Sequence, residues 1–196
     1  MGRIIRPKNK LARAIGEDLG LKVKSDKVAK RLNVPPGQHG PRGKRKASGY
    51  ATQLKEKQKV RFMYGLMERQ LRRYVMEALK ARGETGSMLL RELERRLDNV
   101  VYRLSLAPTR AAARQLTSHG HVRVNNRKVT APSYRVAVND IISFSSRAPI
   151  IPVMTGVNPP SWLKRKAAVG KIARLPQRED ILEVITEQLV VEFYSR

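Results

Sequence analysis

The stretch that decides the fold is RELERRLDNVVYRLSLAPTRAAARQLTSHGHVRVN, residues 91–125. Its first part repeats apolar residues at helical spacing, and Pro108 prevents that helix from continuing. Thr109 is a residue type that caps helix N-termini, so we expect a second, short helix through Leu116. From His121 onward apolar and polar residues alternate, which is typical of a strand. The stretch therefore predicts a helix pair followed by a small sheet.

The sheet is predicted from four short segments. Residues 121–124 and 127–130 are expected to form a hairpin, because the Asn-Asn pair between them tolerates the positive φ angles of a tight turn. Further strands are expected over 134–138 and 141–144. Packing the helix pair on this highly twisted antiparallel sheet predicts an aliphatic core made of Leu93, Leu97, Val100, Val101, Leu116, Val122, Val124, Val136 and Ile142.

The chain on either side of this region has a different character. Residues 1–49 lack sustained periodicity, and the Pro-Pro-Gly run at 35–37 predicts a turn-rich loop. A helix is expected to begin near residue 49, and a second one, over 66–82, has an apolar stripe that gives it one buried face. The last segment, 180–196, alternates aliphatic residues with Glu. We expect it to dock, as a short helix or an extended segment, on the N-terminal part.

The expected fold class is therefore α+β, with two domains. A mainly helical, discontinuous domain would comprise residues 1–90 and 160–196, and a small α+β domain would comprise 91–150. A proline-rich connector is expected over 146–162. Trp162, the only tryptophan, is expected to anchor this connector onto a core through its large apolar area.

The composition indicates a polyanionic partner. Lys and Arg number 41 against 16 Asp and Glu, a formal net charge of +25, and residues 1–82 hold 23 of the basic residues but only 6 of the acidic ones. Self-repulsion at this density is relieved by nucleic acid or by an anionic membrane surface. No apolar run approaches the roughly 18 residues of a spanning helix, and no amphipathic anchor is evident. We therefore expect a cytoplasmic protein that binds nucleic acid.

Catalytic and metal sites are weakly supported by the sequence. His119 and His121 form a His-x-His pair, but no further ligands lie near them and cysteine is absent, so neither a metal nor a cofactor is expected. The run Arg96-Leu97-Asp98 resembles the catalytic motif of one class of pseudouridine synthases. Its helical context instead favours a structural Asp98 paired with an arginine. No enzyme activity and no small-molecule substrate are expected.

Specific strings add a family resemblance. The region 91–144 resembles the S-four RNA-binding domain, also called the alpha-L motif, on the strings RRLDNVVYRL (95–104), RQL (114–116) and HGHVRVN (119–125). Strings outside it resemble the bacterial small-subunit (30S) ribosomal protein S-four family: PPGQHG (35–40), LKEKQK (54–59), LPQRED (175–180) and EQLVVEFYSR (187–196). The resemblance covers nearly the whole chain in order.

This resemblance implies a function on the ribosome. It implies a primary 16S rRNA-binding protein that nucleates assembly of the 5′ domain, affects translational accuracy and neighbours ribosomal proteins S-five and S-three. It also implies a lining of the channel through which mRNA enters, carried by Arg42, Lys44, Arg45 and Lys46. The alternative is a stand-alone S-four-domain RNA-modifying or stress-response factor. The missing catalytic domain and the full-length order of motifs discriminate against that alternative.

Residues that lie off the apolar stripes are expected to bind rRNA. Arg110 and Arg114 are expected to face the ligand, so that replacing both with Ala would weaken RNA binding without unfolding the domain. The four-cysteine zinc site of some family members is absent here, and prolines replace the long charged helix expected after the sheet. The full expected set is Arg3, Arg6, Lys8, Lys10, Arg13, His39, Lys55, Lys57, Lys59, Arg61, Arg69, Arg72, Arg73, Arg110, Arg114, His119, His121, Arg123, Asn125, Arg127 and Lys128.

Overall fold

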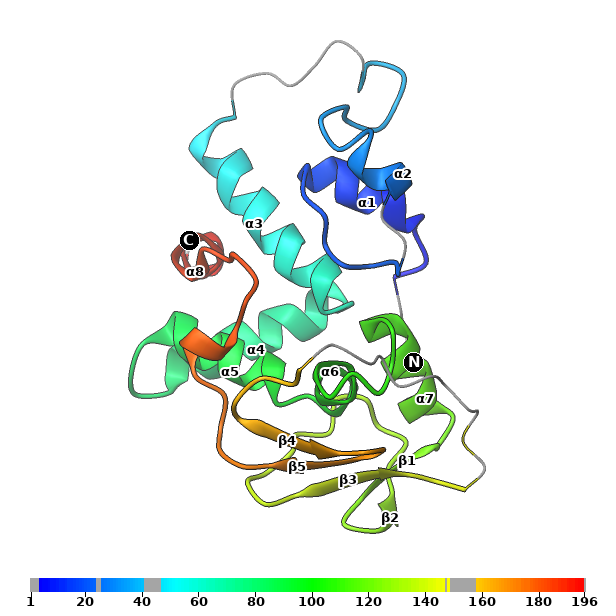
Figure 1. The fold of residues 1–196 in the computed structure, drawn as a ribbon. Helices are drawn as coiled ribbons and strands as arrows, with labels where there is room; N and C mark the ends of the chain where they lie inside the picture. The colour runs from blue at the N-terminus through cyan, green and yellow to red at the C-terminus, as the bar shows by residue number, and fades with distance from the viewer. Residues whose placement is uncertain (1–3, 24–25, 41–46, 147, 149–157, 196) are drawn as a thin grey trace. The chain divides into compact units, whose positions relative to one another are not determined.

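The computed structural model describes residues 4–23, 26–40, 47–146, 148 and 158–195. The chain divides into two compact units (Figure 1). The first, here the helical unit, comprises Met1–Gly86 and Val184–Arg196, and the second, here the sheet unit, is Ser87–Glu183. Within the described residues no helix is both long and apolar enough to cross a membrane.

The helical unit is built from short amphipathic helices. Their bounds are α1 Lys8–Ile15, α2 Asp26–Ala29, α3 Gly49–Met63, α4 Glu68–Lys80 and α8 Glu187–Tyr194, while α5, Thr85–Glu94, begins in this unit. Ser48 caps α3 by accepting a hydrogen bond from the backbone N–H of Ala51 at 3.3 Å. The apolar stripe of α4 is buried through Leu71, Tyr74, Val75 and Ala78, whereas Leu79, which the sequence also placed on this stripe, is 39% exposed.

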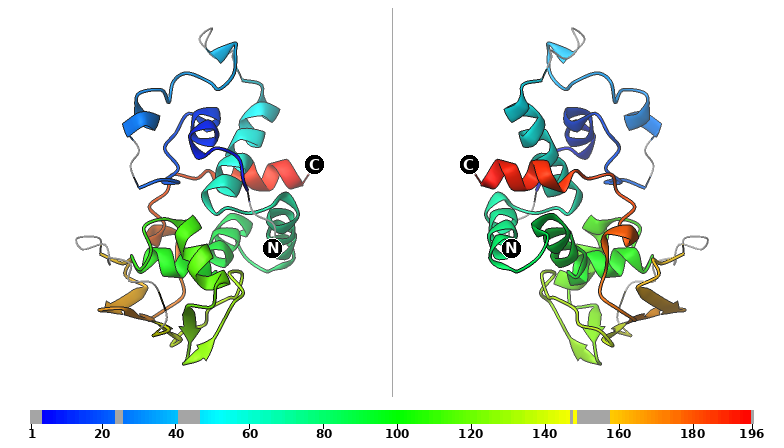
Figure 2. Two further views of the ribbon diagram at one scale, coloured as in Figure 1. Left: turned by 90° about the vertical axis from the view of Figure 1, so that its right-hand side faces the viewer. Right: turned by 90° about the vertical axis from the view of Figure 1, so that its left-hand side faces the viewer.

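The C-terminal helix packs back on the N-terminal part, which confirms the sequence prediction for this segment. Helix α8 lies beside α3 in both views of Figure 2, and it also contacts α4. The Gln53 side chain donates a hydrogen bond to Glu192 at 2.8 Å, and the backbone N–H of Thr186 donates one to Glu56 at 2.9 Å. A discontinuous helical unit follows from these contacts.

The sheet unit places two helices on one face of an antiparallel sheet (Figure 1). After α5 come α6, Leu97–Arg103, and α7, Arg110–Ser118. Thr109 caps α7 as predicted, accepting a hydrogen bond from Ala112 N at 3.2 Å. The sheet has the order β2-β1-β3-β5-β4, with β1 Val122–Val124, β2 Arg127–Lys128, β3 Ile141–Phe144, β4 Leu163–Lys166 and β5 Val169–Ile172.

The core of this unit is the aliphatic one that the sequence predicts. Every residue of the expected core set is buried. Trp162 is fully buried in the same cluster, which confirms its expected role as an anchor. The hairpin turn is also confirmed, because Asn125 and Asn126 both have positive φ, 48° and 65°. The structure therefore has the α+β fold class that the sequence predicts.

The sheet departs from the prediction in two places. Residues 134–138 are not a strand, since the backbone there makes an isolated bridge between Arg96 and Arg135. Conversely, the sequence predicts no strands over 163–172, whereas β4 and β5 form a hairpin that joins the sheet through β3. The apolar face of this hairpin is hard to read from sequence because Gly170 contributes no side chain to it.

The β4–β5 hairpin also changes the division of the chain. The sequence places residues 160–183 in the helical domain, whereas they lie in the sheet unit, because β5 pairs with β3 and Trp162 enters that unit's core. The proline-rich connector expected over 146–162 lies mostly outside the described residues.

Candidate nucleic-acid interface

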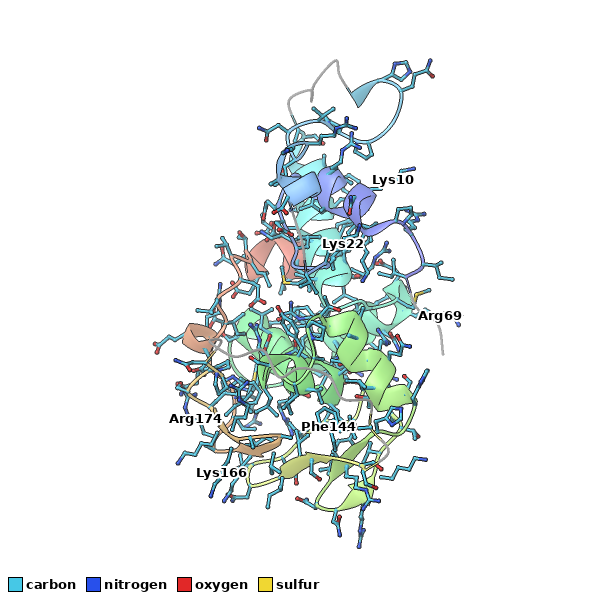
Figure 3. The ribbon with its side chains drawn as sticks, turned by 45° about the vertical axis from the view of Figure 1, so that its right-hand side comes forward. Lys10, Lys22, Arg69, Phe144, Lys166 and Arg174 are labelled. Carbon is cyan, nitrogen blue, oxygen red and sulfur yellow. The ribbon has the colours of Figure 1, made fainter. Side chains whose placement is uncertain are left out.

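The exposed face of α4 carries a row of guanidinium groups. Arg69, Arg72 and Arg73 are exposed, and they alternate with the buried Leu71 and Tyr74 at helical spacing. Figure 3 shows the Arg69 side chain at the surface of the helix. Three planar cations on one rigid helix suit phosphate groups, which guanidinium binds through two parallel hydrogen bonds.

The N-terminal segment presents a second group of cations. Arg6 and Lys10 are exposed and Lys8 is half-buried at the start of α1, where Figure 3 shows the labelled Lys10 at the surface. His39 is exposed in the proline-glycine loop. Arg3 and the four expected mRNA-facing residues, Arg42, Lys44, Arg45 and Lys46, lie outside the described residues.

Arg13 turns inward to the loop. Its Nε donates to the carbonyl of Val34 at 2.9 Å, and its Nη2 donates to the carbonyl of Pro35 at 3.0 Å. A guanidinium that ties α1 to the Pro-Pro-Gly run holds that loop in place. Arg13 therefore positions the loop, and its hydrogen-bonding capacity is already used in part by the protein.

Four cations of α3 are ion-paired within the helical unit, and three of them are at least half-buried. Lys57 and Lys59 are only 6% and 5% exposed, and Arg61 is half-buried. The Lys57 ammonium lies 2.8 Å from a Glu68 oxygen, Arg61 lies 3.0 Å from the other, and Lys59 pairs with Glu17. These three are withdrawn from the expected rRNA-binding set, because their charged groups are at least partly buried and are paired with acids. Lys55 also lies 4.0 Å from Glu17, but its side chain is 46% exposed.

Glu68 is the centre of this cluster. Besides Lys57 and Arg61, the hydroxyl of Tyr194 donates a hydrogen bond to it at 2.7 Å. Burial raises the pKa of the Glu68 carboxyl, but these three hydrogen bonds outweigh burial, so its pKa lies below the ordinary value. Burial, together with the same carboxylate, raises the pKa of Tyr194 far above its usual range. The cluster keeps Glu68 charged and α8 docked.

Arg110 is part of a second buried network, in the sheet unit. Arg103 and Arg110 both pair with Glu183, and Arg103 also pairs with Glu94 at 2.9 Å. Arg110 donates to Asn99 at 2.8 Å. Burial raises the pKa of Glu183, yet the charges of Arg110 and Arg103 lower it to about 2.

The expectation that Arg110 and Arg114 face a ligand is therefore corrected. The Arg110 side chain is 10% exposed and its guanidinium lies 4.5 Å from the Tyr102 ring centre. The Arg114 side chain is 13% exposed, with Nε 4.0 Å from Asp98. Helix periodicity put both off the apolar stripe, but the acidic partners come from segments that only the fold brings close. Both side chains therefore make contacts within the sheet unit.

Asp98 has a structural partner, as its helical context predicts. Arg96 is buried and donates to both oxygens of Asp98, at 3.1 and 2.8 Å. The backbone N–H of Asn99 donates to the same carboxylate at 2.9 Å. The Asp98 carboxylate is thus used by contacts within the sheet unit, and Arg96 and Arg103 are both buried.

The β1–β2 hairpin and the residues just before it include both exposed and half-buried members of the expected rRNA-binding set. Arg127, Lys128 and His119 are exposed, while His121 and Arg123 are half-buried. The Asn125 side chain is used by the protein, since it donates to Asp140 at 2.8 Å and accepts from Ile141 N at 2.9 Å. The Asn125 side chain thus has a structural role at the turn. Arg123 donates to Asn126 at 3.2 Å and keeps further donors.

Sequence reasoning missed three cations of the β4–β5 hairpin. Lys164, Lys166 and Lys171 are all exposed, and they alternate with the buried Leu163 and Ile172. The alternation in LKRK and in VGKI was the available signal, although each segment is only four residues long. These residues extend the cationic surface along the sheet.

Comparison with known protein families and with known proteins gives matches along this chain. Residues 3–94 match the ribosomal protein S4/S9 N-terminal domain, and residues 95–142 match the S4 domain. The small ribosomal subunit proteins uS4 of Akkermansia muciniphila and Cutibacterium acnes are each 45% identical to this chain, and that of Porphyromonas gingivalis is 44% identical. Each alignment covers 100% of this chain and 100% of the relative.

The chain belongs to the uS4 family. This uS4 family member is thus a protein of the small ribosomal subunit and not an enzyme, which confirms the resemblance drawn from the motifs. Its S4 domain, an RNA-binding module, covers α6, α7 and the β1–β3 part of the sheet. The stand-alone enzyme or stress factor is accordingly set aside.

Proposed function

We propose that this protein is a primary 16S rRNA binder that nucleates assembly of the 5′ domain of the small subunit. The observation that carries the proposal is the cationic face of α4, where Arg69, Arg72 and Arg73 are exposed on a helix whose opposite face is buried. Phosphate contacts from Arg and Lys fix a protein on folded RNA, whose deep major groove excludes side chains. Family membership supports the ribosomal setting.

The interactions around Glu68 support a preformed binding surface. Through this carboxylate Lys57 and Arg61 hold α3 against α4, and Tyr194 holds α8 against α4, so the α4 arginines lie on a helix that is already fixed in place. A surface that is already ordered loses less conformational entropy on binding than a flexible one. We therefore expect recognition of RNA shape by a rigid protein surface.

The finer roles follow from the family resemblance. We propose that ribosomal proteins S-five and S-three are neighbours in the subunit and that changes in this chain alter translational accuracy. We also propose that Arg42, Lys44, Arg45 and Lys46 face the channel through which mRNA enters. The basic character of that run supports the last proposal.

The test is a filter-binding titration of the full chain against a 16S rRNA 5′-domain junction at several salt concentrations. Wild type should bind the junction in preference to plain duplex, with affinity falling steeply as salt rises. Replacing Arg69, Arg72 and Arg73 with Gln should weaken binding at least about tenfold and lower the log–log salt slope by about two to three. Equal affinity of wild type for junction and duplex would contradict the proposal.

A matched control removes three other exposed charges. Lys22→Gln, Lys30→Gln and Arg82→Gln change the net charge equally but leave the α4 face intact. This control variant should bind the junction much more tightly than the α4 variant. If the two variants weaken binding equally, then net charge and not the α4 face governs the interaction.

A further inference from the structure

The outer face of the sheet is a cationic surface outside α4 and the N-terminal segment. Lys164, Lys166 and Lys171 point away from the core, because each is exposed while Leu163 and Ile172 beside them are buried. Figure 3 shows Lys166 on the side of the sheet away from α6 and α7. On the core side of β4, Arg165 instead donates to the carbonyl of Leu104 at 2.9 Å. The three lysines of the β4–β5 hairpin thus lie on the outer face of the sheet, and Arg165 lies on its core face.

This face places like charges directly opposite each other. Lys164 pairs across the strands with Lys171, and at the other end of the sheet Arg123 pairs with Lys128. Side chains of directly opposed residues are about 5 Å apart at Cβ, and opposed like charges destabilise a sheet. The five described strands contain neither Asp nor Glu to offset this repulsion. An anionic partner would relieve it.

The spacing of the two pairs suits an extended polyanion. The strand order puts β3 between them, and β3 contributes the uncharged Ile141 and Ser143 to this face. Two interstrand steps of about 4.8 Å, or roughly 10 Å, separate Arg123 on β1 from Lys171 on β5, and four steps, or roughly 19 Å, separate Lys128 on β2 from Lys164 on β4. RNA helices display two phosphate backbones on either side of a wide, shallow minor groove lined with 2′-hydroxyls. Two separated pairs of cations can contact both backbones.

The residues between the cations favour duplex RNA over other partners. The exposed aliphatic residues of the face, Ile141 and Val169, are 46% and 43% exposed, and no aromatic side chain of the five described strands is exposed. Single-stranded RNA is bound largely by stacking bases on aromatic rings, and protein interfaces centre on buried aromatic or aliphatic anchors. The described strands expose no aromatic ring for stacking or anchoring, and their two exposed aliphatic side chains stand among cations that bind phosphate.

We propose that the outer face of the sheet is a second RNA contact surface, which grips the backbone of an RNA helix through Lys164, Lys166, Lys171 and Arg123. The inference rests on the proposed rRNA-binding function and assigns it a surface separate from α4. Binding here is independent of base sequence, because its contacts are to phosphates. Through this face the protein holds a second helical segment of the same folded RNA.

The experiment compares full-length Lys164→Gln, Lys166→Gln, Lys171→Gln with wild type and with the Lys22, Lys30 and Arg82 control variant. On the 16S 5′-domain RNA the sheet variant should bind at least about tenfold more weakly, with a log–log salt slope lower by about two to three. Its melting temperature without RNA should equal or exceed that of wild type, because a like-charge pair is removed. A binding defect with unimpaired folding supports the proposal.

A second measurement uses the wild-type chain and so avoids any question of folding. Acetylation of surface lysines is mapped by mass spectrometry for the free protein, for its complex with the RNA and for whole small subunits. Lys164, Lys166 and Lys171 should be protected in both bound states, while Lys30 reports the background. Protection in subunits but not in the RNA complex would assign the face to a neighbouring protein and overturn the proposal.

The outcomes separate this inference from the proposed function. If wild type fails to prefer the junction, the proposed function itself is contradicted. If wild type binds and the α4 variant is weakened, but the sheet variant binds like the control variant, then only the second surface is excluded.

Discussion

The hydroxyl of Tyr194 donates a hydrogen bond to Glu68 at 2.7 Å, joining the last helix to α4 across 126 residues of chain. Lys57 and Arg61 reach the same carboxylate from α3. One half-buried acid thereby links three helices of the helical unit, and the Phe193-Tyr194 pair near the end of the chain acquires a structural role. Lys57 also lies 4.3 Å from the Phe193 ring centre.

Replacing Tyr194 with Phe should therefore destabilise the helical unit. The change deletes a hydrogen bond to a charged acceptor, which is worth about 1–2 kcal/mol at a partly buried site. Urea unfolding monitored by circular dichroism measures the loss. The control is Tyr50→Phe, because Tyr50 is 53% exposed and should tolerate the change. Equal stability of Tyr194→Phe and wild type would mean that the bond does not hold α8.

Arg110→Ala should unfold the sheet unit more readily and not merely weaken RNA binding. The substitution leaves Glu183 with Arg103 as its remaining guanidinium partner and deletes the bond to Asn99. Removing one partner of a buried ion pair costs about 3–5 kcal/mol, and the residual pairing with Arg103 places this case toward about 3. Thermal unfolding measures the change. Arg69→Ala, at an exposed position, should stay within about 0.5 kcal/mol of wild type.

The stability of the sheet unit should depend on acid through Glu183. Its pKa is about 2 in the folded protein against 4.5 ordinarily. A lowered folded pKa means that the stabilisation is fully present above pH ~4.5 and is lost as the pH falls toward 2. The difference in unfolding free energy between wild type and Glu183→Gln should be about 3 kcal/mol at neutral pH and should shrink across that window. A difference that does not change with pH would refute this linkage.

Gly170→Ala should destabilise the sheet by steric overlap. A Cβ at this position would lie 2.3 Å from Leu104 Cδ1, closer than packed atoms approach. Overpacking of this kind costs about 1–3 kcal/mol. Gly49→Ala is the matched control, because no atom lies within 4 Å of its Cβ position and alanine favours a helix. Chemical unfolding of both variants gives the comparison, and an unperturbed Gly170→Ala would show that Leu104 can move aside.

Some features could be predicted from local pattern. Thr109 as a cap, the Asn125-Asn126 turn, the buried stripe of α4 and the aliphatic core all depend on residues close in sequence or on apolar periodicity. Strands β4 and β5 could not, because each is four residues long and the core face of β5 includes a glycine. The strand predicted over 134–138 was wrong for a different reason. Apolar and polar residues alternate there, but the segment is irregular and Val136 is its single buried residue.

The sequence by itself determined the family, the α+β class and the surplus of positive charge, because these depend on composition, periodicity and motif order. Only the tertiary structure decided which cations remain available. Lys57, Lys59 and Arg103 are basic residues on helices, as Lys55 and Arg69 are, yet they are buried against acids. Arg110 is half-buried and pairs with Glu183. Glu183 lies 73 residues from Arg110 along the chain. Such pairings depend on how distant segments meet, and periodicity within one helix carries no information about them.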